Sequence, residues 1–103
     1  MTEELPLACS LSASDAARRG RWWARVMERA NGVSAQPGGF VARFDASAEL
    51  EGELRRVAAA EAECCPFLQI DVARAPDELS LTITGPPRAQ PVIAQIQTTS
   101  QPK

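Results

Sequence analysis

The chain has 103 residues, a formal net charge of −2 and 45% hydrophobic residues, which predicts one globular domain with a modest core. A nucleic-acid-binding protein would need a basic face, so this charge argues against a nucleic-acid partner. The sequence contains no histidine, which excludes histidine-based catalysis and Cys/His zinc fingers.

The sequence predicts a cytosolic protein with no membrane partner. Its first residues, Met1 to Glu4, are acidic where a secretory signal is basic. No apolar run approaches the roughly 20 residues that a membrane span needs. Thiols stay reduced in the cytosol, and an odd count of three cysteines argues against paired disulfides.

The N-terminal third predicts a strand and then a long helix. Residues Leu5–Leu11 alternate in polarity, with Cys9 on the apolar face. Ser12 or Ser14 is a good helix cap, and apolar residues at helical spacing continue the helix to about Ala30. We interpret the arginines of this helix as a solvated face: Arg18, Arg19, Arg21 and Arg25.

Three further strands are predicted downstream. The stretch Val33–Gly39 contains a Pro-Gly-Gly run and is interpreted as a loop. Residues Gly39–Asp45 alternate as a strand. Two more alternating runs, Leu68–Ala73 and Leu79–Thr84, flank a turn and predict a hairpin.

A second helix is predicted between these strands. Ser47 or Asp45 caps its start, where acidic side chains suit the positive end of the helix dipole. Pro66 disfavours helical geometry for the residue before it, so the helix should end near Cys64 or Cys65. Its last turn therefore carries two adjacent thiols.

The predicted fold class is α/β (α+β), a two-layer sandwich. The expected order is β-α-β-α-β-β, with a four-stranded mixed sheet and the helices on one face. A short C-terminal helix contains Val92, Ile93 and Ile96. We expect a single domain over residues 1–97 and a flexible tail over 98–103.

The segment from Glu61 to Phe67 is the strongest candidate for a functional site. On a helical wheel, Glu61 falls near the centre of the apolar stripe, with Cys64 and Cys65 on its two shoulders. In the expected fold, Cys9 faces the same core layer. Three thiolates, or two with a carboxylate, suit a soft ion such as Hg(II), As(III), Cu(I) or Zn(II).

Each of these residues also has a purely structural interpretation. Free cysteine is often a small core residue. Glu61 can instead be a partly exposed carboxylate that pairs with an arginine of the neighbouring helix. Of Trp22 and Trp23, we expect one in the core and one at its rim, where it could mark a partner surface.

The same residues carry a resemblance to known proteins. An early cysteine, a Glu-x-x-Cys-Cys-x-Phe segment and a final Leu-x-Leu-x-Ile-x-Gly-Pro strand occur here at Cys9, Glu61 to Phe67 and Leu79 to Gly85-Pro86. They resemble short bacterial domains associated with heavy-metal regulators of the MerR type and with mercury or arsenic resistance. The resemblance implies thiophilic metal binding at Cys9, Cys64 and Cys65.

The element order also resembles that of small sulfur-relay proteins of the TusA type. Their Cys-Pro-x-Pro motif begins the first helix, where this chain has Ser12-Ala13-Ser14. The likeness is therefore one of fold alone.

Three functional hypotheses follow. The first is a non-enzymatic thiol module that binds a soft ion through Cys64, Cys65 and Cys9. In it Glu61 is a supporting base or a weak ligand, and Phe67 is a shield from water. The second is a thiol redox or sulfur-carrier protein. The third is an interaction domain with buried cysteines, for which we expect a homodimer or another protein partner.

Overall fold

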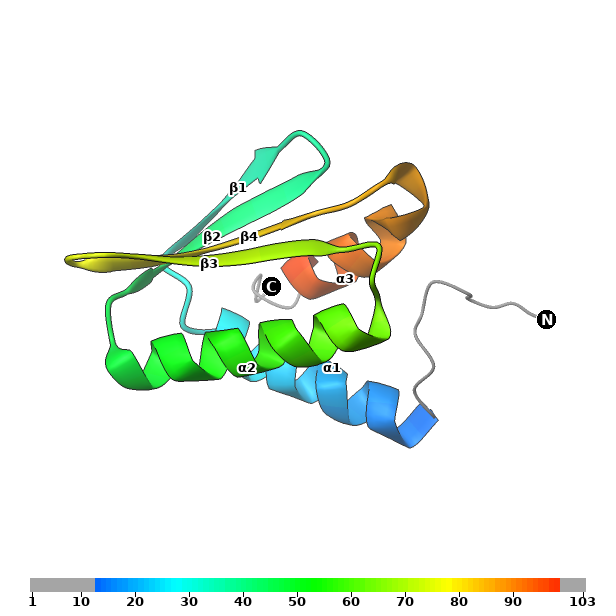
Figure 1. The fold of residues 1–103 in the computed structure, drawn as a ribbon, viewed down its shortest axis with the longest axis horizontal. Coiled ribbons are helices and arrows are strands. Elements are labelled where there is room, and N and C mark those ends of the chain that lie inside the picture. Colours follow the sequence, from blue (N-terminus) through cyan, green and yellow to red (C-terminus); the bar gives the residue numbers. More distant parts are fainter. Residues whose placement is uncertain (1–12, 99–103) are drawn as a thin grey trace.

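The computed structural model describes residues 13–98, in which three α-helices lie on one face of a four-stranded sheet (Figure 1). The predicted strand Leu5–Leu11, with Cys9, lies outside these residues. Of the predicted tail 98–103, Thr98 is the last residue of a helix and the rest lies outside the described residues. The elements follow as α1 (Ala13–Met27), β1 (Gly32–Gln36), β2 (Gly39–Asp45), α2 (Ala48–Cys64), β3 (Gln69–Ala75), β4 (Glu78–Thr84), a 3₁₀ turn (Pro87–Ala89) and α3 (Gln90–Thr98).

The α+β class and the two-layer arrangement are confirmed, but the expectation of a mixed sheet is wrong. Within residues 13–98 every strand pairing is antiparallel, in the order β1-β2-β4-β3. Strands β2 and β3 run in the same direction and have β4 between them. Helix α2 connects β2 to β3. The predicted β-α-β unit is therefore present, with β4 lying between its two parallel strands.

The interpretation of Val33–Gly39 as a loop is also wrong. Strand β1 pairs with β2 over the register that ends at Gln36 opposite Gly39, so only Pro37 and Gly38 form the turn. Gly38 has a φ of 81°, a backbone conformation that residues with a side chain rarely adopt. A proline followed by a glycine in this conformation fits a type II turn. Strand β1 is largely exposed and lacks an alternating apolar pattern, which explains why periodicity missed it.

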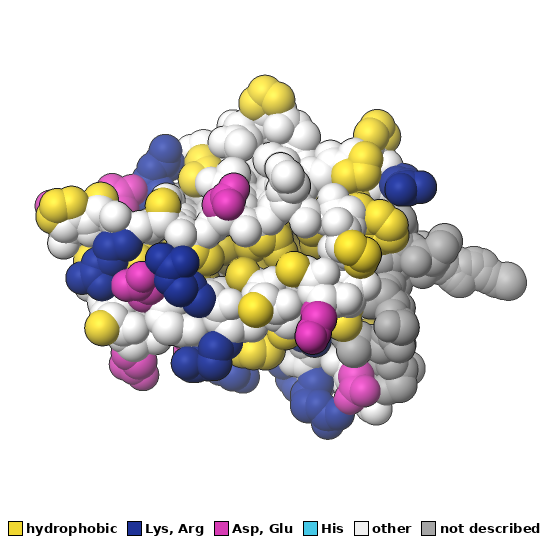
Figure 2. Space-filling view, in the orientation of Figure 1, with side chains coloured by type: hydrophobic (Ala, Val, Ile, Leu, Met, Phe, Trp, Pro, Cys, Tyr) yellow, Lys and Arg dark blue, Asp and Glu magenta, His cyan; other side chains and the backbone are white. Residues whose placement is uncertain are grey.

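The core lies between the helices and the inner face of the sheet. Figure 2 shows hydrophobic side chains between the two layers, with charged side chains further out. Alternate residues of β2 and β4 point into this core, as the period-two pattern predicted. The buried apolar side chains of the main elements are Trp23, Val26, Met27, Phe40, Ala42, Phe44, Leu50, Leu54, Val57, Ala58, Leu79, Leu81, Ile83, Ile93 and Ile96.

Helix α2 has the predicted ends. The Ser47 hydroxyl accepts a hydrogen bond from the backbone N–H of Leu50 at 3.1 Å, which satisfies one free donor of the first turn. The helix ends at Cys64. Cys65 is its C-terminal cap, and the N–H of Cys65 donates to the carbonyl oxygen of Glu61 at 2.7 Å. The two thiols therefore lie where the chain leaves the helix.

The structure bears on membrane association in one respect. Within residues 13–98, no helix combines the length and the hydrophobicity that a membrane crossing requires.

An ion-pair cluster on the surface joins α2 to β3. The Glu51 carboxylate accepts hydrogen bonds from Arg74 of β3 at 2.8 Å and from Arg55 of α2 at 2.9 Å. The hydrogen bonds from Arg74 and Arg55 lower the pKa of Glu51 below its ordinary value of 4.5. The charged form of Glu51 is thus favoured by the folded state.

We expect the contribution of Glu51 to stability to depend on pH. Because its pKa is lower in the folded than in the unfolded chain, the stabilisation is complete above the unfolded value and is lost as pH falls through the folded value. Urea unfolding of wild type and Glu51→Gln should differ at pH 7, and the difference should shrink below pH 4.5. Glu28→Gln is the control, since Glu28 is exposed and has no ion pair within residues 13–98. A difference that does not change with pH would contradict this assignment.

Candidate functional site

The candidate site lies where α1 and α2 pack against each other. The two helices run antiparallel, so the first half of α1 faces the last turns of α2 (Figure 1). This arrangement brings Arg19 and Trp23 of α1 to Glu61 of α2. The site is thus assembled from residues about 40 positions apart in the sequence.

Glu61 is a buried carboxylate held by two donors. Its exposed fraction is 5%, and it is the one buried charged residue in the part of the chain that the structure describes. Its Oε1 accepts hydrogen bonds from the indole N–H of Trp23 at 2.8 Å and from Nη1 of Arg19 at 3.2 Å. The structure thus confirms the predicted core-facing position and the pairing with an arginine, and excludes a partly exposed carboxylate. A buried carboxylate needs such partners, because burial without them is costly.

Arg19 corrects the interpretation of the arginines as a uniformly solvated face. Its side chain is only 16% exposed, whereas that of Arg18 is 65% exposed. Burial by itself lowers the pKa of Arg19, but the charge of Glu61, together with hydrogen bonds to Glu61 and Cys64, raises it above the ordinary value. The guanidinium is therefore a fixed positive charge in the space between the helices.

The two thiols of α2 have different surroundings. Cys64 is half-buried, and its Sγ accepts a hydrogen bond from Nη2 of Arg19 at 3.9 Å. Cys65 is 1% exposed and belongs to the hydrophobic core. Cys64 is thus a partly exposed thiol beside a positive charge, which is the environment in which reactive thiols occur. Cys65 is packed as a small apolar residue.

The structure brings together part of the predicted metal site. Glu61 and Cys64 share Arg19 as a partner. Cys9, the predicted third ligand, lies outside the described residues. Between residues 13 and 98, no three His, Cys, Asp or Glu side chains lie close enough together to hold a metal ion. The predicted ligand set of Cys9, Cys64 and Cys65 therefore stays a prediction.

Phe67 lies beside the thiols and closes one side of the core. Its half-buried ring packs against the core cluster, and the guanidinium carbon of Arg88 lies 4.9 Å from the ring centroid. This is the distance of a cation–π contact. The predicted role of Phe67 as a shield for a bound ion stays a prediction.

Sequence reasoning missed the role of Arg19, although a signal for it was present. Arg19 precedes Trp23 by four residues, and Met27 follows by four more, so all three lie on one face of α1. Trp23 and Met27 are both buried. An arginine on a buried stripe of one helix and a glutamate on a buried stripe of the next are a candidate pair. The expectation for the tryptophans is confirmed, because Trp23 is buried while Trp22 is half-buried.

Comparisons of the chain with protein-family models, with curated proteins and with solved structures found no match. The resemblance to domains associated with MerR-type regulators is not tested by them.

We predict that the Arg19–Glu61 pair is needed for stability. Arg19→Met leaves the carboxylate buried without its counter-charge, and removal of one partner from a buried pair costs about 3 kcal/mol or more in the free energy of unfolding. Glu61→Leu in the same chain should restore part of this loss, because no charge is then buried. Arg18→Met, on the exposed face, should cost less than about 0.5 kcal/mol. Urea unfolding measures all three, and equal costs for Arg19→Met and Arg18→Met would contradict the assignment.

Proposed function

We propose that this chain is a cytosolic, non-enzymatic module that binds a soft metal or metalloid ion through Cys64 and Cys65, with Cys9 as third ligand. The observation that supports it best is the pair of adjacent thiols at the end of α2, one of which contacts the Arg19 guanidinium. Adjacent sulfurs suit ions that prefer thiolate ligands, such as Hg(II), As(III), Cu(I) and Zn(II).

In this proposal Cys64 is the first thiol to meet the ion. It is the more exposed of the two, and its sulfur lies 3.9 Å from Nη2 of Arg19. Cys65 then turns from the core toward the bound ion. Cys65 has φ −125° and ψ 79°, so it lies outside the regular helix. Its side chain can thus change direction without breaking the hydrogen bonds within α2.

Glu61 acts through Arg19 rather than as a ligand. The hydrogen bonds from Arg19 and Trp23 occupy its Oε1 atom, and the carboxylate lies inside the helix interface. Its charge holds the Arg19 guanidinium in place, and Arg19 in turn contacts Cys64. Glu61 is therefore a positioning residue for the thiol.

A second candidate function is a thiol redox or sulfur-carrier protein with Cys64 as nucleophile. The contact between Arg19 and the Cys64 sulfur supports it as well, since reactive thiols occur beside cationic side chains. The location at a helix C-terminus counts against it, because the dipole there is negative. The two functions differ in whether an ion stays bound at equilibrium.

We expect the freshly reduced protein to take up one Hg(II) or arsenite per chain, as measured by native mass spectrometry. Both Cys64→Ser/Cys65→Ser and Cys9→Ser should lose affinity, the double variant more, because thiolates carry the binding. The affinity is compared with that for Zn(II), and it is measured in competition with an excess of a small dithiol. Uptake by the double variant equal to wild type would contradict the proposal. Rapid alkylation of Cys64 at neutral pH without retained ion would favour the redox or carrier function.

A further inference from the structure

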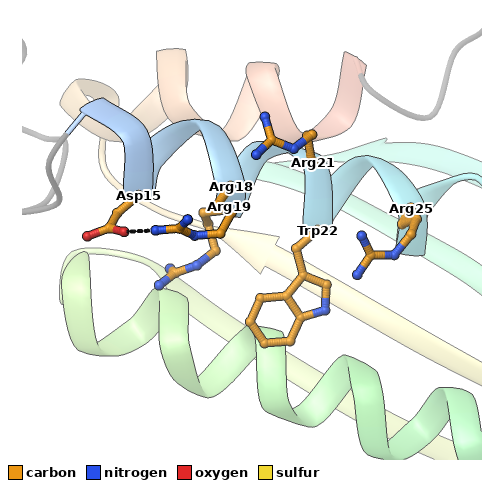
Figure 3. A pocket seen from close by; sticks show the side chains of 6 residues that line it. All are labelled: Asp15, Arg18, Arg19, Arg21, Trp22 and Arg25. Carbon is orange, nitrogen blue, oxygen red and sulfur yellow. Dashed lines mark hydrogen bonds and ion pairs between the residues drawn. The ribbon is translucent and has the colours of Figure 1, made fainter.

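A hollow of about 560 Å³ runs along α1 and is lined by charged residues (Figure 3). Arg18, Arg21 and Arg25 recur at helical spacing along it, and Trp22 extends from α1 toward α2. The side chains that line the hollow are Asp15, Arg18, Arg19, Arg21, Trp22 and Arg25.

The hollow carries a local excess of positive charge on an acidic chain. Four guanidinium groups line it against one carboxylate, that of Asp15, which pairs with Arg18. Two carboxylates that do not line the hollow pair with two of its other arginines: Glu61 lies 3.2 Å from Arg19, and Glu53 lies 3.8 Å from Arg25. The guanidinium of Arg21 forms no ion pair within residues 13–98. The net charge of the whole chain is −2, so this concentration of arginines is a local feature that offers guanidinium donors to an anion.

Trp22 gives the hollow an apolar surface. Its indole N–H donates a hydrogen bond to Oε2 of Glu53 at 3.0 Å, which fixes the ring between the two helices. A half-buried ring held in this way can pack against the carbon atoms of a small ligand. The hollow therefore suits a small organic anion better than a bare inorganic ion.

Arg19 connects the hollow to the thiol. It lines the hollow and also donates a hydrogen bond to the sulfur of Cys64. Cys64 does not itself line the hollow, but its sulfur lies 3.9 Å from Nη2 of Arg19, which does. A ligand whose acidic groups bind the arginines would carry any sulfur-bound group to within reach of this thiol.

We propose that the hollow binds anionic small-thiol compounds and presents them to Cys64, the physiological ligand being a soft metal ion carried by two carboxylate-bearing thiolates. This inference rests on the proposed metal-binding function for the identity of the cargo. In the transfer step the sulfur of Cys64 forms a bond to the metal, and one carrier thiolate leaves. The proton of the Cys64 thiol passes to the departing thiolate, and no atom is oxidised or reduced.

The test measures the rate of Cys64 modification by an anionic and by a neutral disulfide, dithiobis(nitrobenzoate) and dithiodipyridine. Peptide mass spectrometry assigns the reaction to Cys64. In Arg18→Gln/Arg21→Gln/Arg25→Gln, the rate with the anionic reagent should fall roughly tenfold or more, while the rate with the neutral reagent stays within about twofold. Arg19 is left in place because it contacts Glu61 and Cys64.

The matched control changes the net charge by the same amount at other sites. Arg29→Gln/Arg43→Gln/Arg56→Gln removes three exposed guanidiniums that do not line the hollow. It should retain most of the anionic rate. Equal losses in the two triple variants would show general charge attraction and overturn the proposal. An equal fall of the neutral rate in the hollow variant would also overturn it.

A competition experiment decides the size of the ligand. Citrate should slow the anionic reagent and spare the neutral one, because it carries carboxylates but no thiol. An acidic peptide that blocks the reaction at far lower concentration than citrate would overturn the assignment in favour of a protein partner.

The outcome is separable from that of the proposed function. Equilibrium uptake of Hg(II) tests the metal cargo, and the ratio of the two disulfide rates tests the hollow without any metal. If the protein reacts faster with the anionic reagent but retains no ion, the docking site is supported and the proposed metal function is contradicted. If the protein retains the ion but shows no preference for the anionic reagent, the metal function is supported and the docking site is contradicted.

Discussion

The buried carboxylate of Glu61 fixes how the two long helices meet. A charge in this position is tolerated only with donors at close range, and Arg19 and Trp23 of α1 are two such donors. Apolar side chains could pack in several registers, whereas one carboxylate must meet one guanidinium and one indole N–H. Arg19 and Trp23 are one helical turn apart. Together they fix the rotation of α1 about its own axis and its position along α2. The position of Cys64 beside Arg19 follows from that alignment.

The Arg19 side chain joins three parts of the molecule. One nitrogen contacts Glu61 and another contacts the sulfur of Cys64, while the same side chain forms part of the wall of the arginine-lined hollow. The buried pair removes most of the freedom of this long side chain. A guanidinium held in advance loses little further entropy when it meets a ligand. The stability of the helix pair and the chemistry of the thiol therefore depend on the same atoms.

Much of the fold could be predicted from local pattern. The ends of α2 followed from Ser47 and Pro66, and the hairpin of β3 and β4 followed from alternation. Strand β1 could not be predicted, since it is exposed and its pairing depends on the neighbouring strand. The candidate site was predicted on α2 but not on α1. Its Arg19 contacts join distant segments, and composition alone gave the arginines a solvated role.

Under the proposed function, the unequal burial of the two thiols would couple ligand binding to the packing of the core. Cys64 reaches solvent, whereas Cys65 belongs to the cluster that contains Leu68. A ligand that bridges both sulfurs can bind only the conformation in which Cys65 has left that cluster. Because this conformation is sparsely populated, the apparent affinity of the ligand is reduced by the same fraction. A ligand that needs only Cys64 carries no such cost. Under the proposed function, the chain would discriminate between bridging and single-thiol ligands through the strength of its own core, not through any contact with the ligand.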